Sequence, residues 1–199
     1  MFTALDGGNV KGGVLRAYLD WLKLRHPSAL ETLRQEVSPE TSRILATAVL
    51  PTNWYPFRTV VETARAIAAI QGGDERDTAI ELGRHSARVN LTTSYKAFAK
   101  QHPHDFFRNV GRLHRQFEDF GRATYEEIGP TSGRLSMMDC ACYAKTYCLS
   151  ALGFFQEATA MQGGHAPVVT EGECYCEGRT ACRFEIRWSE PAPGSRVTQ

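Results

Sequence analysis

The segment 171–188, with the sequence EGECYCEGRTACRFEIRW, contains the pattern that decides the fold. From Arg183 onward it alternates charged side chains with the apolar side chains of Phe184, Ile186 and Trp188. This alternation is typical of a strand with one buried face. With segment 166–175 before it and a turn at 177–179 (EGR), it predicts a closing β-hairpin.

Helical spacing of apolar residues dominates the chain before this hairpin. It predicts helices over 10–26, 28–37, 38–49, 58–71, 75–97 and 105–120, with an aromatic turn at 51–57. Two short β-like segments, 121–128 and 134–140, and a helix over 143–161 follow. Helices first and hairpins later predict an α+β fold, with an antiparallel sheet packed against helices.

The composition is that of an ordinary globular protein. The 199 residues are 42% hydrophobic and 23% charged, and the net charge is +1. These values exclude a largely disordered chain and give no electrostatic case for binding nucleic acid. We expect a cytoplasmic protein because neither a secretory signal nor a membrane span is visible. We expect one continuous domain, with a helical region at 1–100, an α+β region at 101–190 and a flexible tail at 191–199.

All six cysteines lie in the last third of the chain, at positions 140, 142, 148, 174, 176 and 182. In secreted domains, disulfides usually cross-link the chain along its whole length. Clustered thiols without a signal peptide instead favour a reducing compartment and metal or redox chemistry.

Four residues can converge if the helix over 143–161 packs across the hairpin: Cys148, Glu171, Cys174 and Cys182. Three thiolates and one carboxylate suit a tetrahedral Zn²⁺ ion, and a closed four-ligand site is structural. Other interpretations stay open. Cys148 can be a buried core thiol and Glu171 a solvated acid. The CxC pairs 140/142 and 174/176 can form a rival four-thiolate site, or Cys140, Cys142 and Cys176 can be spare, oxidisable thiols.

The segment EGECYCEGRTACRFEIRW, with Cys148 upstream, resembles the 4-vinyl reductase domain over about 105–188. The likeness is to its zinc-bearing version in the sensor domains of phenol-responsive bacterial transcription activators. There a Cys, a Glu, a Cys three residues later and a Cys eight residues after that bind one zinc ion. The resemblance therefore implies zinc at Cys148, Glu171, Cys174 and Cys182.

The N-terminal half is similar to an unannotated family of myxobacterial paralogues through VKGGVL (10–15) and WYPF (54–57). Both families belong to a broader fold that includes H-NOX haem domains and small TRAPP subunits. This resemblance implies a four- to five-stranded antiparallel sheet, small-ligand or lipid pockets, and dimers. The Tyr-x-Ser-x-Arg motif of H-NOX haem domains is absent from the sequence, so haem is not expected. The aromatic-ligand contacts of the phenol sensors are not matched either.

A group of aromatic and histidine side chains can line an apolar pocket. The candidates are Trp54, Phe57, His102, Phe106, Phe107, Tyr125 and Phe155. The competing interpretation is that the aromatic residues are ordinary core. The histidines at 102, 104 and 114 can be ligands, but are more often surface or cap residues.

These observations predict a non-catalytic, zinc-containing sensor or adaptor that binds a small apolar or aromatic molecule. We expect the protein to be a homodimer, and as an adaptor it would bind a protein partner. The sequence contains no phosphate loop and no nucleophile elbow. Two alternatives remain: an accessory factor or reductase-like enzyme of tetrapyrrole or aromatic metabolism, by analogy with the family name, and a structural interaction protein without a small ligand.

Overall fold

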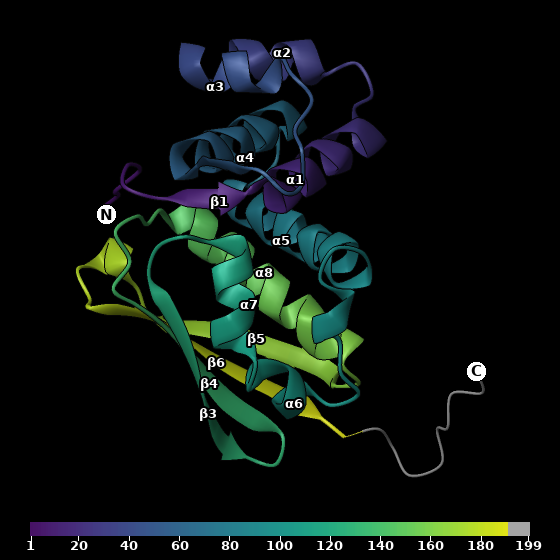
Figure 1. The fold of residues 1–199 in the computed structure, drawn as a ribbon, viewed down its shortest axis with the longest axis vertical. Coiled ribbons are helices and arrows are strands. Elements are labelled where there is room, and N and C mark those ends of the chain that lie inside the picture. The colour runs from purple at the N-terminus through teal and green to yellow at the C-terminus, as the bar shows by residue number, and fades with distance from the viewer. Residues whose placement is uncertain (191–199) are drawn as a thin grey trace.

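The computed structural model describes residues 1–190, and the predicted tail at 191–199 lies outside this range. It has the predicted α+β architecture, with helices packed on a four-stranded antiparallel sheet (Figure 1). The helices are α1 (Gly12–Arg25), α2 (Leu30–Gln35), α3 (Pro39–Leu45), α4 (Phe57–Gln71), α5 (Glu75–Thr92), α6 (Pro103–Phe107), α7 (Val110–Phe117) and α8 (Lys145–Met161). The strands are β1 (Asn9–Lys11), β2 (Trp54–Pro56), β3 (Arg122–Gly129), β4 (Ser132–Met138), β5 (His165–Glu173) and β6 (Ala181–Ser189). Two short 3-10 helices are η1 (Lys96–Phe98) and η2 (Tyr175–Glu177).

The main sheet has the strand order β3-β4-β6-β5, and every neighbouring pair is antiparallel. The alternation in β6 is confirmed, because Phe184, Ile186 and Trp188 are all buried. The register places Phe184 opposite Leu135 and Cys182 opposite Met137. One face of this sheet therefore belongs to the core and the other carries the charged side chains.

Helix α8 lies between the sheet and α5, and two glycines set how closely α5 and α8 approach (Figure 1). A Cβ atom on Gly83 would overlap the carbonyl oxygen of Ser150, and one on Gly153 would overlap that of Ile80. The two helices therefore touch backbone to backbone, which any larger side chain would prevent.

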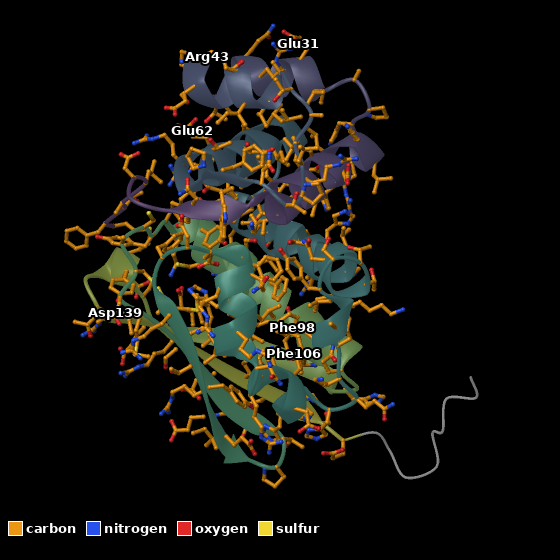
Figure 2. The ribbon with its side chains drawn as sticks, in the orientation of Figure 1. Glu31, Arg43, Glu62, Phe98, Phe106 and Asp139 are labelled. Carbon is orange, nitrogen blue, oxygen red and sulfur yellow. The ribbon has the colours of Figure 1, made fainter. Side chains whose placement is uncertain are left out.

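The outer helical layer consists of α1 to α4, above α5. Ser38 caps α3 through a hydrogen bond from the Thr41 amide, with Pro39 in the first turn. Figure 2 shows Glu31 and Arg43 at the outer edge of this layer, whereas Phe106, a residue of α6, lies near the sheet. Phe106 is buried.

Three predicted elements differ most from the structure, apart from shifts at helix ends such as that of the helix predicted over 38–49, which ends at Leu45. The aromatic turn at 51–57 contains β2, which pairs with β1. The helix predicted over 105–120 is broken into α6 and α7, where the Asn109 side chain donates a hydrogen bond to the Asp105 carbonyl. The helix predicted over 75–97 ends at Thr92, where the hydroxyls of Thr92 and Thr93 bond to carbonyls of the last turn and compete with the helix.

The N-terminal segment crosses to the tip of the β5–β6 hairpin, next to η2 (Figure 1). The Phe2 amide donates a hydrogen bond of 2.8 Å to the Cys176 carbonyl, and Ala4 pairs with Tyr143. The first residues of the chain are thus joined to its last hairpin. Within residues 1–190, none of the helices combines the length and the apolar character that crossing a membrane requires.

Candidate functional site

Three thiols and one carboxyl group converge where α8 crosses the β5–β6 hairpin. Helix α8 supplies Cys148, β5 supplies Glu171, the turn before η2 supplies Cys174, and β6 supplies Cys182. The Sγ atom of Cys148 lies 3.7 Å from that of Cys174 and 3.8 Å from that of Cys182, and the last two are 3.8 Å apart. All four ligand atoms lie within 4.8 Å of one another.

This geometry fits a single metal ion. Metal–sulfur bonds of about 2.3 Å in a tetrahedron separate the sulfur atoms by about 3.8 Å. The Oε1 atom of Glu171 is buried and has no hydrogen-bond partner among residues 1–190. A buried oxygen without a partner is costly, and a cation would satisfy it. The four side chains can therefore hold a thiolate-preferring ion as a closed set.

Lys145 fixes the other oxygen of the carboxylate. Its Nζ atom lies 2.5 Å from Glu171 Oε2 and 3.0 Å from Glu177 Oε1. Burial raises the pKa of Glu171 to about 7, while Lys145 opposes the increase. In Cys174, hydrogen bonds from the neighbouring thiols lower the pKa, which favours the thiolate that metals bind.

The remaining cysteines do not form the rival four-thiolate site. Within the described residues, Cys140 Sγ contacts the Met138 carbonyl and Cys142 Sγ contacts the Asp6 carbonyl, at 3.7 and 3.3 Å. Cys176 is buried beside Cys148 and Cys174. All six cysteines are free thiols.

A cavity of about 70 Å³ lies between the helices and the sheet. That volume is several times the roughly 10–15 Å³ that a single water needs, but its wall is mostly apolar, and such cavities favour apolar occupants. Helices α1, α5, α7 and α8 and strands β3 and β4 contribute to the wall. Its residues are Val14, Tyr18, Ser86, Val110, Leu113, His114, Phe117, Glu118, Ala123, Met137, Tyr147, Ala151, Phe154 and Phe155.

The polar groups of the wall gather around Glu118, which is 9% exposed. Its Oε1 atom accepts a hydrogen bond of 2.8 Å from the Tyr147 hydroxyl, and Oε2 lies 3.3 Å from His114 Nδ1. Burial raises the pKa of Glu118 and, even more strongly, that of Tyr147. The Tyr18 hydroxyl is paired with Ser150 at 2.5 Å. The cavity thus has one ionisable end in an otherwise apolar wall.

A second, smaller hollow of about 30 Å³ connects the two sites. It shares Glu118, Met137, Tyr147 and Ala151 with the main cavity, and it also touches Cys148 and Cys182. Helix α8 therefore contributes both to the cysteine cluster and to the wall of the main cavity.

The seven predicted pocket residues do not meet in this cavity. Phe155 lines it. Phe57 packs edge-on against Tyr147, and Phe106 and Phe107 are buried core. Two others occupy positions outside the wall: Trp54 is 41% exposed, and His102 caps α6.

Tyr125 also lies outside the wall. Its hydroxyl is 2.7 Å from Nδ1 of His104, whose Nε2 faces the carbonyls of Gly129 and Pro130. His104 is buried and hydrogen-bonded rather than a surface residue.

Of the pocket residues, His114 was considered only as a possible ligand that is more often a surface or cap residue, and Glu118 was not singled out. The charged residues Arg112 and Arg115 beside them are typical of a solvated helix face. Both His114 and Glu118 are buried. The signal was present in the spacing, since His114 follows Val110 by four positions and precedes Glu118 by four, on the same face as Phe117.

No family model and no curated protein matches the chain. Solved structures do resemble it, among them several H-NOX proteins. One is from S. oneidensis in the Fe(II)NO ligation state, with a TM-score of 0.72, 10% identity, and coverage of 90% of this chain and 99% of that one. For an Fe(II) unliganded H-NOX mutant from K. algicida, the TM-score is 0.69 and the identity 12%, and the match covers 92% of this chain and 98% of that one. For an oxygen-binding H-NOX domain related to soluble guanylate cyclases, the TM-score is 0.67 and the identity 12%, and the match covers 94% of this chain and 100% of that one.

At these identities the comparisons show the fold, and they confirm the predicted fold class. They correct two other predictions. The resemblance to the zinc-bearing 4-vinyl reductase domain, with its myxobacterial relatives, was wrong as an assignment, because the similar structures are H-NOX proteins and no family model supports it. Zinc was wrong as the cofactor, because the group named for the H-NOX structures is haem. The short cysteine pattern was specific enough to suggest a family but covers too little of the chain to establish one.

The residues of this cavity do not fit a haem. Nε2 of His114 lies 2.9 Å from the Phe120 carbonyl oxygen, and Nδ1 faces Glu118, so both ring nitrogens are used within the protein. A volume of about 70 Å³ is also far too small for a porphyrin ring. The cavity therefore suits a much smaller molecule than haem.

Proposed function

We propose that this protein is a non-catalytic sensor or adaptor module that binds a small, mainly apolar molecule between its helices and its sheet. The observation that carries this proposal is the apolar cavity with one ionisable end. Cavities of this kind, with few convergent polar groups, are typical of small-molecule sites. The fold shared with oxygen-binding and NO-ligated H-NOX proteins supports a sensing role by analogy.

A ligand would act by favouring one arrangement of the wall over another. Helix α8 contributes Tyr147, Ala151 and Phe155 to the wall, and β4 contributes Met137. A molecule that fills the cavity contacts both elements, so it changes the relative stability of positions that α8 can take on the sheet.

We also propose that Cys148, Glu171, Cys174 and Cys182 hold one metal ion, which ties α8 to the β5–β6 hairpin. The ion would be structural, because the four ligands leave no open position for chemistry. Thiolate ligands favour a soft or borderline transition metal. The buried, unpartnered Glu171 oxygen and the sulfur spacing support this site.

The domain division stays a proposal: regions 1–100 and 101–190 form one folding unit, since α5 packs along α8. The homodimer, the protein partner and the cytoplasmic location remain predictions.

Native mass spectrometry of protein purified from its own host tests the sensor proposal. We expect a bound molecule of low mass, lost on denaturation, together with a mass increment of one metal ion. Elemental analysis then identifies the ion. A haem absorption band would overturn the small-ligand proposal, and turnover of a vinyl or aromatic substrate would overturn the non-catalytic one.

A further inference from the structure

The polar end of the cavity has unused capacity to accept hydrogen bonds. A carboxylate offers about four lone-pair sites. Two partners reach Glu118 from the described residues, Tyr147 at Oε1 and His114 at Oε2. The other polar groups of the wall are engaged elsewhere. Tyr18 pairs with Ser150, and the Ser86 hydroxyl accepts from Asn90.

The electrostatic surroundings of Glu118 favour positive charge. No described residue in the cavity wall is a lysine or an arginine. Asp119 adds a second negative charge nearby, and burial keeps the pKa of Glu118 raised even though His114 and Tyr147 oppose the increase. The carboxylate is therefore only partly compensated by the protein, and a cation in the cavity would supply the missing compensation.

We propose that the cavity selects small apolar amines, bound as cations with the ammonium group at Glu118 and the hydrocarbon body against Val14, Leu113 and Phe155. This inference rests on the proposed function and specifies its ligand class. An alcohol of the same shape would gain a hydrogen bond but no charge compensation, and a carboxylate would meet a buried like charge.

Three compounds with the same isobutyl group test this selectivity: isobutylamine, isobutanol and isovalerate. Their binding can be followed by NMR titration of the amides of Ala151 and Phe154, which line the cavity. We expect isobutylamine to bind about ten- to a hundredfold more tightly than isobutanol, and isovalerate not to bind. This ranking is measured on the unmodified protein, so it does not depend on a variant that folds.

Glu118→Gln keeps the shape of the side chain and removes its charge. We expect this variant to lose most of the preference for the amine while isobutanol affinity changes by less than about threefold. Glu31→Gln, the same change at an exposed acid on α2, is the matched control and should leave the ranking intact.

Binding of isobutanol as tight as that of isobutylamine would overturn this inference and leave the sensor proposal standing. So would an unchanged preference in Glu118→Gln. Failure of all three compounds to shift any cavity resonance would overturn the small-molecule site itself, and with it the inference.

Discussion

Helix α8 has two junctions, and they are built differently. On one side it meets α5 backbone to backbone, through Gly83 and Gly153. On the other it meets the β5–β6 hairpin through Cys148, which lies 3.7 Å from Cys174 in a cluster of thiols beside an unpartnered carboxylate oxygen. The first junction is complete in the polypeptide alone. The second buries polar groups that only an added ion would satisfy, so its strength should depend on solution conditions.

The largest effect is expected at the first junction. Gly153→Ala places a methyl group against the Ile80 carbonyl oxygen, well inside van der Waals contact, so α5 and α8 must separate. Overpacking usually costs about 1–3 kcal/mol, and a clash with backbone should reach about 3 kcal/mol or more. Urea unfolding measures the loss. The control is Gly172→Ala, where an added Cβ meets nothing within 4 Å and the stability should hardly change.

At the second junction, stability should depend on metal. Cys182→Ser removes one proposed ligand and should abolish stoichiometric metal binding. If the free ion is present at about 100 times its Kd, the variant should lose about 2.7 kcal/mol, as should the unmodified protein treated with a chelator. Elemental analysis and thermal unfolding check both statements. Cys142→Ser, at a buried thiol outside the cluster, should retain the ion; unchanged metal content in Cys182→Ser would contradict the ligand set.

A pH effect should distinguish the cavity from both junctions. Because burial raises the pKa of Glu118 above 4.5, the folded protein keeps a proton there that the unfolded chain releases. The contribution of this proton to the free energy of unfolding is fully present below about pH 4.5 and is lost as the pH rises through the pKa of Glu118 in the folded protein. Glu118→Gln should therefore lose less stability than the unmodified protein as the pH rises from about 4.5 to 7.5, measured by urea midpoints. If the urea midpoints of the two proteins change in parallel with pH, the pKa of the Glu118 carboxyl is not raised by folding.

The smallest effect is expected for an ion pair at the edge of the first junction. Arg88 on α5 bonds to Glu157 on α8 through both carboxylate oxygens, at 2.8 and 3.0 Å, but the arginine side chain is 51% exposed. Exposed pairs contribute about 0.2–1 kcal/mol. A double-mutant cycle of Arg88→Ala and Glu157→Ala should give a coupling energy in that range. A coupling above about 2 kcal/mol would mean that side chains, rather than the glycines, hold α5 to α8.

The sequence could predict the elements with strong local periodicity, and the spacing of the cysteines along them. The alternation in β6 identified the buried face. Cys148, Glu171, Cys174 and Cys182 were expected to converge, and the structure brings their ligand atoms within 4.8 Å of one another. Zinc was the wrong cofactor, and metal binding by these residues stays a proposal. The cavity could not be predicted in this way, because six elements supply its wall and each residue taken alone looks like core. Its charged end was hidden for another reason. Glu118 lies among surface charges in the sequence, and only the packing of α7 against β3 and β1, together with the contact to Tyr147 of α8, buries it.

The contact between Phe2 and Cys176 has a consequence for how the protein is made. During synthesis, Phe2 leaves the ribosome long before Cys176, its hydrogen-bonding partner, has been made. Such distant pairings slow folding, because chain entropy is lost before the contact forms. The segment around Phe2 should therefore settle late in folding, and a nascent chain stalled before residue 176 should leave that segment open to proteases.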